Sequence, residues 1–155
     1  MTPQRKLKEH IVAWLKSRRY HGSLDRVTTR VRTMADQFVV AIDDDYRVRQ
    51  SIESLLESAD YSPLVFASAK EFMKSGMLAR TACLILDVRM PGMGGIELQH
   101  RIRSERPLLP IIFISAHWNS QSREQALGEG ALDLLPKPFD AGDLLELIRK
   151  ALVHE

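Results

Sequence analysis

The chain has 155 residues, of which 45% are hydrophobic and 27% charged, a composition typical of one globular domain rather than of a disordered chain. It has no apolar run of the roughly 18 residues needed to cross a bilayer and no secretory signal at its N-terminus. Its single cysteine, Cys83, excludes an intramolecular disulfide and fits a reducing compartment, so we expect a cytoplasmic protein with no transmembrane segment.

The formal net charge of +2 is unevenly distributed along the chain. Residues 1–37 contain 9 of the 22 Lys and Arg residues but only 3 of the 20 Asp and Glu residues, so this segment carries +6 and the remainder −4. A charge step of this size is typical of a boundary. We therefore expect a basic N-terminal extension over residues 1–37 and a separate domain over residues 38–155.

The N-terminal extension contains apolar residues at helical spacing with basic residues around them, which predicts a short amphipathic helix. The apolar positions are Leu7, Ile11, Trp14 and Leu15, and the basic ones are Arg5, Lys6, Lys8 and Lys16. Three interpretations stay open: a docking or dimerisation helix, a contact with nucleic acid or an anionic membrane, and translation upstream of a natural start at Met34. No base-reading motif is present, so we do not expect direct nucleic-acid binding.

From Phe38 onward, short apolar runs alternate with longer amphipathic segments, which predicts strand and helix units around a parallel sheet. The predicted strands are residues 38–42, 63–66, 82–87, 110–115 and 131–135. Four of these runs are nearly continuous in apolar residues, as strands covered by helices on both faces require. Cys83 is expected to be a small buried residue of the third strand.

Two of the intervening helices have clear signals. After the first strand, an apolar face repeats at helical spacing through Val48, Ile52, Leu55, Leu56 and Ala59, and Asp45 is expected to be an exposed charge at the N-terminus of this helix. The last helix is expected to begin near Asp140 as its N-cap, with Asp143 in the first turn. Its inward residues are predicted to be Leu145, Ile148 and Leu152.

Polar residues follow several of the predicted strands, and these positions carry the chemistry. Asp43 and Asp44 follow the first strand, Asp87 ends the third, Ser115 ends the fourth and Lys137 follows the fifth. Ligands bind at the carboxyl edge of an open α/β sheet, so we expect these groups to meet there. Carboxylates 4 Å apart repel by roughly 4 kcal/mol at an effective dielectric of about 20, so a cation is needed among them.

Mg²⁺ is the cation that carboxylates of this kind favour, and with Lys137 it would neutralise charge on a phosphoryl group. The hydroxyl of Ser115 would donate a hydrogen bond to an oxygen of that group. We assign the nucleophile to Asp87, because the end of a central strand holds its geometry rigid. The residues therefore predict a phosphoryl-transfer site.

Residues 38–153 resemble the receiver domain of two-component response regulators. The matching motifs are AIDDD at 41–45, LDVRMPGMGG at 86–95, ISA at 114–116 and KPF at 137–139. Successive intervals of 44, 28 and 22 residues separate Asp43, Asp87, Ser115 and Lys137, as in that family. The residues of two segments, VRMPGM and DDDYRVRQS, resemble those of the branch of receivers often fused to helix-turn-helix output domains.

This resemblance implies a doubly wound α/β fold of the flavodoxin-like type, with a five-stranded parallel sheet in the order 2-1-3-4-5 and helices on both faces. It also implies that Asp87 is the phosphoacceptor and takes its phosphoryl group from a phosphohistidine on a sensor histidine kinase. Asp43, Asp44 and Asp87 would hold Mg²⁺, Asp44 more directly than Asp43, with the backbone carbonyl of Arg89 as a further ligand.

The resemblance gives roles to two other residues. Ser115 matches the switch hydroxyl that moves toward the phosphate, and Lys137 matches the lysine that binds it, usually through a cis bond to Pro138. The implied protein is a signalling switch, not a metabolic enzyme, because it catalyses only its own phosphorylation and dephosphorylation. Receivers of this kind often pair through the fourth helix, fifth strand and fifth helix, which here would run from about Asn119 to Leu152.

The sequence departs from the family pattern in three places. Leu134 stands where an aromatic ring usually follows the switch hydroxyl, and a leucine cannot report the switch in the same way. Gly94 replaces a common aspartate before the third helix. The sequence given ends at Glu155, directly after the last receiver helix, so we expect a stand-alone receiver whose output is a contact with an unknown protein.

Two alternative functions remain. A receiver-like interaction module that is never phosphorylated is kept open by Leu134. An aspartyl-nucleophile phosphatase of the haloacid-dehalogenase type would also use an aspartate, Mg²⁺, a hydroxyl and a lysine. That family requires a second aspartate two positions after the nucleophile, where this chain has Arg89, so we disfavour it.

Overall fold

The computed structural model describes residues 37–153, which belong to a compact unit that runs from Gln37 to Glu155. The amphipathic helix expected around residues 7–15 lies outside the described residues. Five strands form one sheet: β1 (Phe38–Ile42), β2 (Pro63–Phe66), β3 (Thr81–Asp87), β4 (Ile111–Ser115) and β5 (Asp133–Pro136). All pairs are parallel and the order is β2-β1-β3-β4-β5, which confirms the predicted fold.

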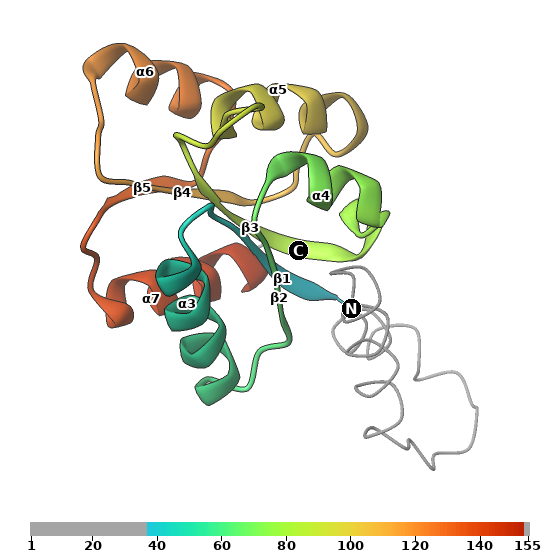
Figure 1. The fold of residues 1–155 in the computed structure, drawn as a ribbon, viewed down its shortest axis with the longest axis vertical. Coiled ribbons are helices and arrows are strands. Elements are labelled where there is room, and N and C mark those ends of the chain that lie inside the picture. Colours follow the sequence, from blue (N-terminus) through green and yellow to red (C-terminus); the bar gives the residue numbers. More distant parts are fainter. Residues whose placement is uncertain (1–36, 154–155) are drawn as a thin grey trace. The chain divides into compact units, whose positions relative to one another are not determined.

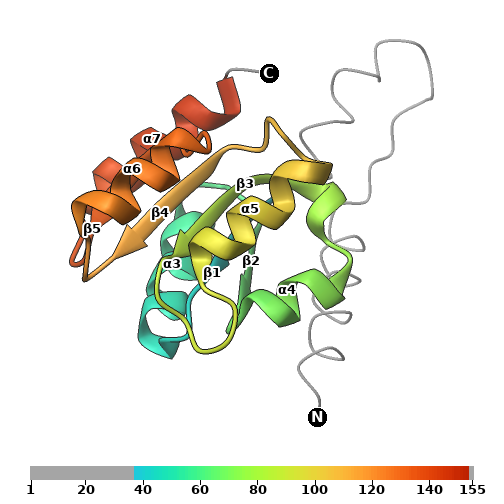
Figure 2. The ribbon, with the colours of Figure 1, turned by 90° about the horizontal axis from the view of Figure 1, so that it is seen from above.

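Helices cover both faces of the sheet. They are α3 (Tyr46–Ser58), α4 (Ala69–Ser75), α5 (Gly95–Glu105), α6 (Ser120–Gly128) and α7 (Ala141–Val153), and a short 3-10 helix, η1 (Leu78–Arg80), precedes β3. Figure 1 shows α3 and α7 below the sheet and α4, α5 and α6 above it, and Figure 2 gives the view turned by 90°. None of the helices in residues 37–153 combines the length and apolarity needed to cross a membrane.

The core on the α3 and α7 face explains why the strands are apolar at consecutive positions. Alternate residues of β1, β3 and β4 pack with α3 and α7 in one buried cluster of Val39, Ala41, Ile52, Leu56, Cys83, Ile85, Ile112, Ile114, Leu144, Leu147, Ile148 and Ala151. The intervening strand residues are buried as well, because α4, α5 and α6 cover the opposite face. Each large apolar side chain buried in this way contributes roughly 1.5–3 kcal/mol of transfer free energy.

Cys83 lies within β3, the central strand, as expected. It pairs with Val39 of β1 in the sheet and is fully buried. Burial disfavours the thiolate and raises the pKa of this thiol to about 12. Cys83 is therefore an inert core residue in the folded chain.

Aspartate side chains cap the N-termini of two helices at the predicted positions. Asp45 is the N-cap of α3 and accepts a hydrogen bond from the Arg47 amide at 2.9 Å. Asp140 precedes α7 and accepts one from the Asp143 amide at 3.1 Å. Each cap satisfies an amide that the first helical turn leaves without a partner and contributes about 1 kcal/mol.

Two predictions about the later elements were wrong in part. Of the three inward residues predicted for α7, Ile148 is buried, whereas Leu145 and Leu152 are only partly buried. The other buried residues of α7 are Leu144, Leu147 and Ala151. The fifth strand was predicted over residues 131–135 but spans Asp133–Pro136. The reason is that the Ala131 amide bonds the Ala126 carbonyl at the end of α6, which keeps Ala131 in the turn.

Arg103 ties α5 to the segments that flank it. Its guanidinium donates to the carbonyl of Glu129 at 2.9 Å and of Gly130 at 3.1 Å, after α6, and to the carbonyl of Leu109 at 2.7 Å, before β4. Burial lowers the pKa of this guanidinium, and the charge of Glu129 acts in the opposite direction. One side chain thus satisfies carbonyls in two connections that no helix or strand satisfies.

Candidate phosphoryl-transfer site

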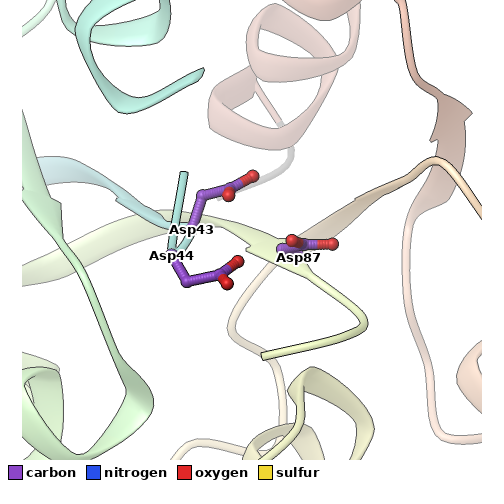
Figure 3. Close-up of side chains that lie close together, drawn as sticks. All are labelled: Asp43, Asp44 and Asp87. Atoms are coloured by element: carbon purple, nitrogen blue, oxygen red, sulfur yellow. The ribbon is translucent and has the colours of Figure 1, made fainter. Parts of the chain in front are cut away.

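Three carboxylates meet where β1 and β3 end. Asp43 and Asp44 directly follow β1, and Asp87 is the last residue of β3, the strand next to β1. One carboxylate oxygen from each of the three lies within 4.8 Å of the others. In Figure 3, the side chains of Asp43 and Asp44 extend from the end of β1 toward the side on which Asp87 lies. The parallel topology therefore brings together acids that are 44 positions apart in the sequence.

Lys137 supplies a positive charge to this cluster. Its Nζ lies 2.7 Å from Oδ2 of Asp43 and 3.2 Å from Oδ2 of Asp87. Lys137 follows β5 directly, its bond to Pro138 is cis, and its backbone amide donates to the Ser115 carbonyl at 2.9 Å. The ammonium therefore bridges acids from two strands while its main chain is fixed against β4.

Burial makes the charge on Asp87 costly. Desolvation is the largest cause of the raised pKa of its carboxyl, and the negative charge of Asp43 raises it further. The charge and hydrogen bond of Lys137 and a backbone hydrogen bond from Arg89 act in the opposite direction without cancelling the rise in this pKa. Burial and the charge of Asp43 thus disfavour the charged form of the Asp87 carboxyl relative to a carboxyl in water.

The pKa of Lys137 responds to the same neighbours. Burial lowers it, but the hydrogen bonds and charges of Asp43 and Asp87 outweigh burial and raise the pKa of the ammonium overall. Lys137 therefore stays protonated at neutral pH and compensates part of the negative charge around it.

Asp43 and Asp44 differ in their surroundings. The Asp43 side chain is fully buried; its Oδ1 accepts from the Asp45 amide at 2.8 Å and its backbone carbonyl accepts from Arg49 at 2.8 Å. Asp44 is exposed. Asp43 is thus already satisfied by protein groups, whereas the Asp44 carboxylate is open to a ligand from solvent.

Ser115 lies at the same edge of the sheet but has different partners. It is the last residue of β4 and is buried, one position beyond Ile114, which pairs with Asp87. Its Oγ donates to the His117 carbonyl at 3.2 Å and accepts from the His117 amide at 3.1 Å. Within residues 37–153, the hydroxyl makes no hydrogen bond to Asp87 or Lys137.

Gly95 lets α5 begin directly against the backbone of Asp87. Its amide donates to the Val88 carbonyl at 3.0 Å. A Cβ built on Gly95 would overlap the carbonyl oxygen of Asp87, so only glycine fits here. Gly94, the N-cap of α5, provides no side-chain cap, in keeping with the missing aspartate.

The contacts of the loop after Ser115 were missed by sequence reasoning. The backbone of His117 holds the Ser115 hydroxyl, accepting a hydrogen bond at its carbonyl and donating one from its amide. The ring of Trp118 packs edge-on against Phe113, with centroids 6.0 Å apart and an interplanar angle of 89°. No sequence signal distinguishes these contacts, since a backbone carbonyl is present at every residue.

The acidic cluster fits a small divalent cation. Its oxygens are hard ligands of the kind Mg²⁺ prefers, and Mg²⁺ typically binds through one or two carboxylates while keeping several waters. The exposed Asp44 provides an entry side, and Asp87 provides an oxygen on the neighbouring strand. The contribution predicted for the Arg89 carbonyl stays a prediction.

The chain is similar to known proteins over most of its length. The model of the response regulator receiver domain family matches residues 39–149. Transcriptional regulatory protein TdiR of Thauera aromatica is 39% identical over 114 residues, covering 74% of this chain and 50% of that protein. Response regulator protein TmoT of Ectopseudomonas mendocina is 40% identical over 138 residues, covering 87% of this chain and 60% of that protein. The chain thus spans little more than half the length of these curated relatives.

A solved structure gives the same picture. The response regulator receiver domain protein from Clostridium thermocellum superposes with a TM-score of 0.71 at 27% sequence identity, covering 76% of this chain and 94% of that one. The order of the strands, the acidic cluster with Lys137 and the family match over residues 39–149 all point to the same family. The chain belongs to the response regulator receiver domain family.

Proposed function

We propose that the chain is a phosphorylatable signalling switch in which Asp87 accepts a phosphoryl group from a phosphohistidine of a sensor histidine kinase. The observation that carries this proposal is the buried Asp87 carboxylate at the carboxyl edge of the sheet, with Asp43 beside it and the Lys137 ammonium 3.2 Å away. A carboxylate with an adjacent fixed cation is suited to attack on phosphorus, because the cation offsets the charge that accumulates on the phosphoryl oxygens.

The proposed transfer is a displacement at phosphorus. An oxygen of Asp87 forms the new P–O bond while the P–N bond of the phosphohistidine breaks, and the bonding pair stays on the imidazole nitrogen. The product on this chain is an acyl phosphate. Water later attacks the same phosphorus and breaks that P–O bond, which releases inorganic phosphate and restores the carboxylate. The chain would therefore catalyse only its own phosphorylation and dephosphorylation.

The acidic cluster would hold Mg²⁺ through Asp44, Asp43 and Asp87, with the backbone carbonyl of Arg89 as the further ligand. The bound ion would neutralise negative charge shared between the carboxylates and the phosphoryl group. Asp44 is the more direct ligand because its carboxylate is exposed, whereas both carboxylate oxygens of Asp43 already bond protein groups. Lys137 would bind one phosphoryl oxygen, and Ser115 would donate its hydroxyl to another.

Output in this proposal is a protein contact that changes with phosphorylation. The surface made by α6, β5 and α7, from about Asn119 to Leu152, is the candidate for homodimerisation or for an output partner. Size-exclusion chromatography of the phosphorylated chain tests the dimer, and an unchanged elution volume would favour a separate partner.

The deciding experiment is intact-mass spectrometry after incubation with acetyl phosphate and Mg²⁺. The natural chain is expected to gain one phosphoryl group and Asp87→Asn none. Asp45→Asn is the matched control, because Asp45 belongs to the same aspartate run but caps α3, and asparagine caps equally well, so this variant should gain the group. No gain in any folded variant would support an interaction module that is not phosphorylated.

A further inference from the structure

The connection between β4 and α6 links the Ser115 hydroxyl to a helix in four residues. Ser115 ends β4, and Asn119 is the N-cap of α6. The Asn119 side chain accepts from the Ser122 amide at 2.7 Å, in a capping box that fixes the first turn of the helix. A displacement between Ser115 and Asn119 is therefore passed directly to the start of α6.

The Ser115 hydroxyl currently holds this connection in place through His117. It both donates to the His117 carbonyl and accepts from the His117 amide, at 3.2 and 3.1 Å. A phosphoryl group on Asp87, which pairs with the residue before Ser115, would add three strong acceptor oxygens close by. A hydrogen bond to an anionic oxygen is roughly twice as strong as one to a neutral carbonyl, so the hydroxyl would exchange one acceptor for the other.

Trp118 is the bulky side chain that this exchange would disturb. Its ring packs against Phe113, which lies on the sheet face covered by α5 and α6, since its strand neighbours Ile112 and Ile114 belong to the opposite core. The indole N–H of Trp118 is buried, and no acceptor for it exists among the described residues. Buried donors are nearly always paired, so this indole is an exception, and among the described residues no hydrogen bond of its N–H fixes the ring where it is.

Leu134 is the neighbour of Phe113 on β5, in register with it. Leu134 is buried and its side chain carries neither a ring nor a polar atom. It can fill space beside Phe113 but cannot form a hydrogen bond that would make it move with the Ser115 hydroxyl. Among the described residues, the first Phe, Tyr or Trp on the C-terminal side of Ser115 is Trp118.

We propose that Trp118 is a positioning residue that couples the Ser115 hydroxyl to the start of α6. Loss of the Ser115 bond to the His117 carbonyl releases the connection, the indole leaves its packing on Phe113, and the N-cap of α6 moves with it. This coupling rests on the proposed phosphorylation of Asp87 and specifies how the state of that residue reaches the surface formed by α6.

Tryptophan fluorescence of the full chain carrying Trp14→Phe tests the coupling, since Trp118 is then the sole tryptophan. Acetyl phosphate and Mg²⁺ are added, and emission and intact mass are measured on the same samples. The emission of Trp118 is expected to shift in proportion to the phosphorylated fraction. Asp87→Asn in the same background should show neither the mass gain nor the shift.

Hydrogen exchange of the α6 amides separates Trp118 from Leu134. Trp118→Phe is expected to gain the phosphoryl group while losing most of the phosphorylation-dependent change in α6 exchange, whereas Leu134→Ala is expected to keep that change. A full mass gain with unchanged Trp118 emission would overturn the coupling and leave the proposed function intact. Absence of any mass gain would overturn the proposed function and the coupling with it.

Discussion

Asp87 is a residue whose charge opposes folding when no cation is bound. Its carboxyl is buried next to Asp43, and its pKa lies above the ordinary value of 3.8. The folded chain therefore binds more protons at this site than the unfolded chain does over a window that starts near pH 3.8 and ends at the raised value. Over that window, the contribution of this group to the free energy of unfolding falls as the pH rises.

Asp87→Asn removes this contribution. In EDTA at pH 7, we expect the variant to have a higher free energy of unfolding than the natural chain, and we expect the difference to shrink as the pH falls toward 3.8. Urea unfolding at several pH values measures it. A natural chain more stable than the variant at pH 7 would show that Lys137 overcompensates the burial of Asp87.

Gly95 is a residue at which one added methyl group has a large predicted effect. Gly95→Ala places a Cβ against the Asp87 carbonyl, so we expect a loss of about 1–3 kcal/mol in the free energy of unfolding and a slower phosphoryl gain. Gly128→Ala is the control: no atom lies within 4 Å of a Cβ there, and alanine should stabilise α6 by about 0.5–1 kcal/mol. Equal effects of the two substitutions would contradict the steric argument.

At the residue scale, the sequence predicts groups that act through their own chemistry. Aspartates at strand ends and a lysine after the last strand were placed together from topology alone, and the structure puts Asp43, Asp87 and Lys137 in direct contact. The sequence does not predict that the Ser115 hydroxyl bonds the backbone of His117. That contact depends on the path of a loop, which carries no periodic signal.

At the element scale, the connections at the ends of α5 and α6 depend on Arg103. Arg103→Met removes the donor of the Leu109 and Gly130 carbonyls. It leaves the Glu129 carbonyl with the longer bond from Gln99 Nε2, at 3.4 Å, so we expect a loss of roughly 2 kcal/mol in the free energy of unfolding. Chemical denaturation measures this loss.

Arg101→Met provides the matched comparison on the same helix. Arg101 is exposed and, within residues 37–153, pairs with Glu97 alone, one turn away at 3.2 Å, so its replacement should cost less than roughly 0.5 kcal/mol. If the two variants were equally stable, the carbonyl contacts of Arg103 would contribute nothing measurable.

Strands were easier to predict than their ends. The bounds of β1 and β2 match the prediction. Every residue of β1 is buried, which demands a continuous apolar run, whereas β2 at the edge of the sheet is fully buried only at alternate positions. For β5 the apolar run extends into the preceding turn, and the shift of two residues follows from the bond between the Ala131 amide and the Ala126 carbonyl. Apolarity reports burial, whereas the start of a strand is fixed by hydrogen bonds.

For the molecule as a whole, we expect the acidic cluster to couple stability to a divalent cation. A cation that binds only the folded chain stabilises it by about 1.4 kcal/mol at ten times its dissociation constant. We expect Mg²⁺ to raise the free energy of unfolding of the natural chain in this way and to raise that of Asp44→Asn much less. Thermal unfolding with and without Mg²⁺ measures both, and an equal gain in the two proteins would exclude Asp44 as a ligand.

The burial of Cys83 makes opening of the folded domain measurable by thiol labelling. Its thiol lies within β3, between β1 and β4, with a pKa of about 12, so an alkylating reagent reaches a reactive thiolate only after the central strand has separated from its neighbours. Each alkylated chain is therefore the permanent record of one complete opening event. A ligand that stabilises the fold by about 1.4 kcal/mol should slow this labelling tenfold where reclosing outpaces the reagent. The one cysteine thus reports the open population of the domain without an engineered thiol.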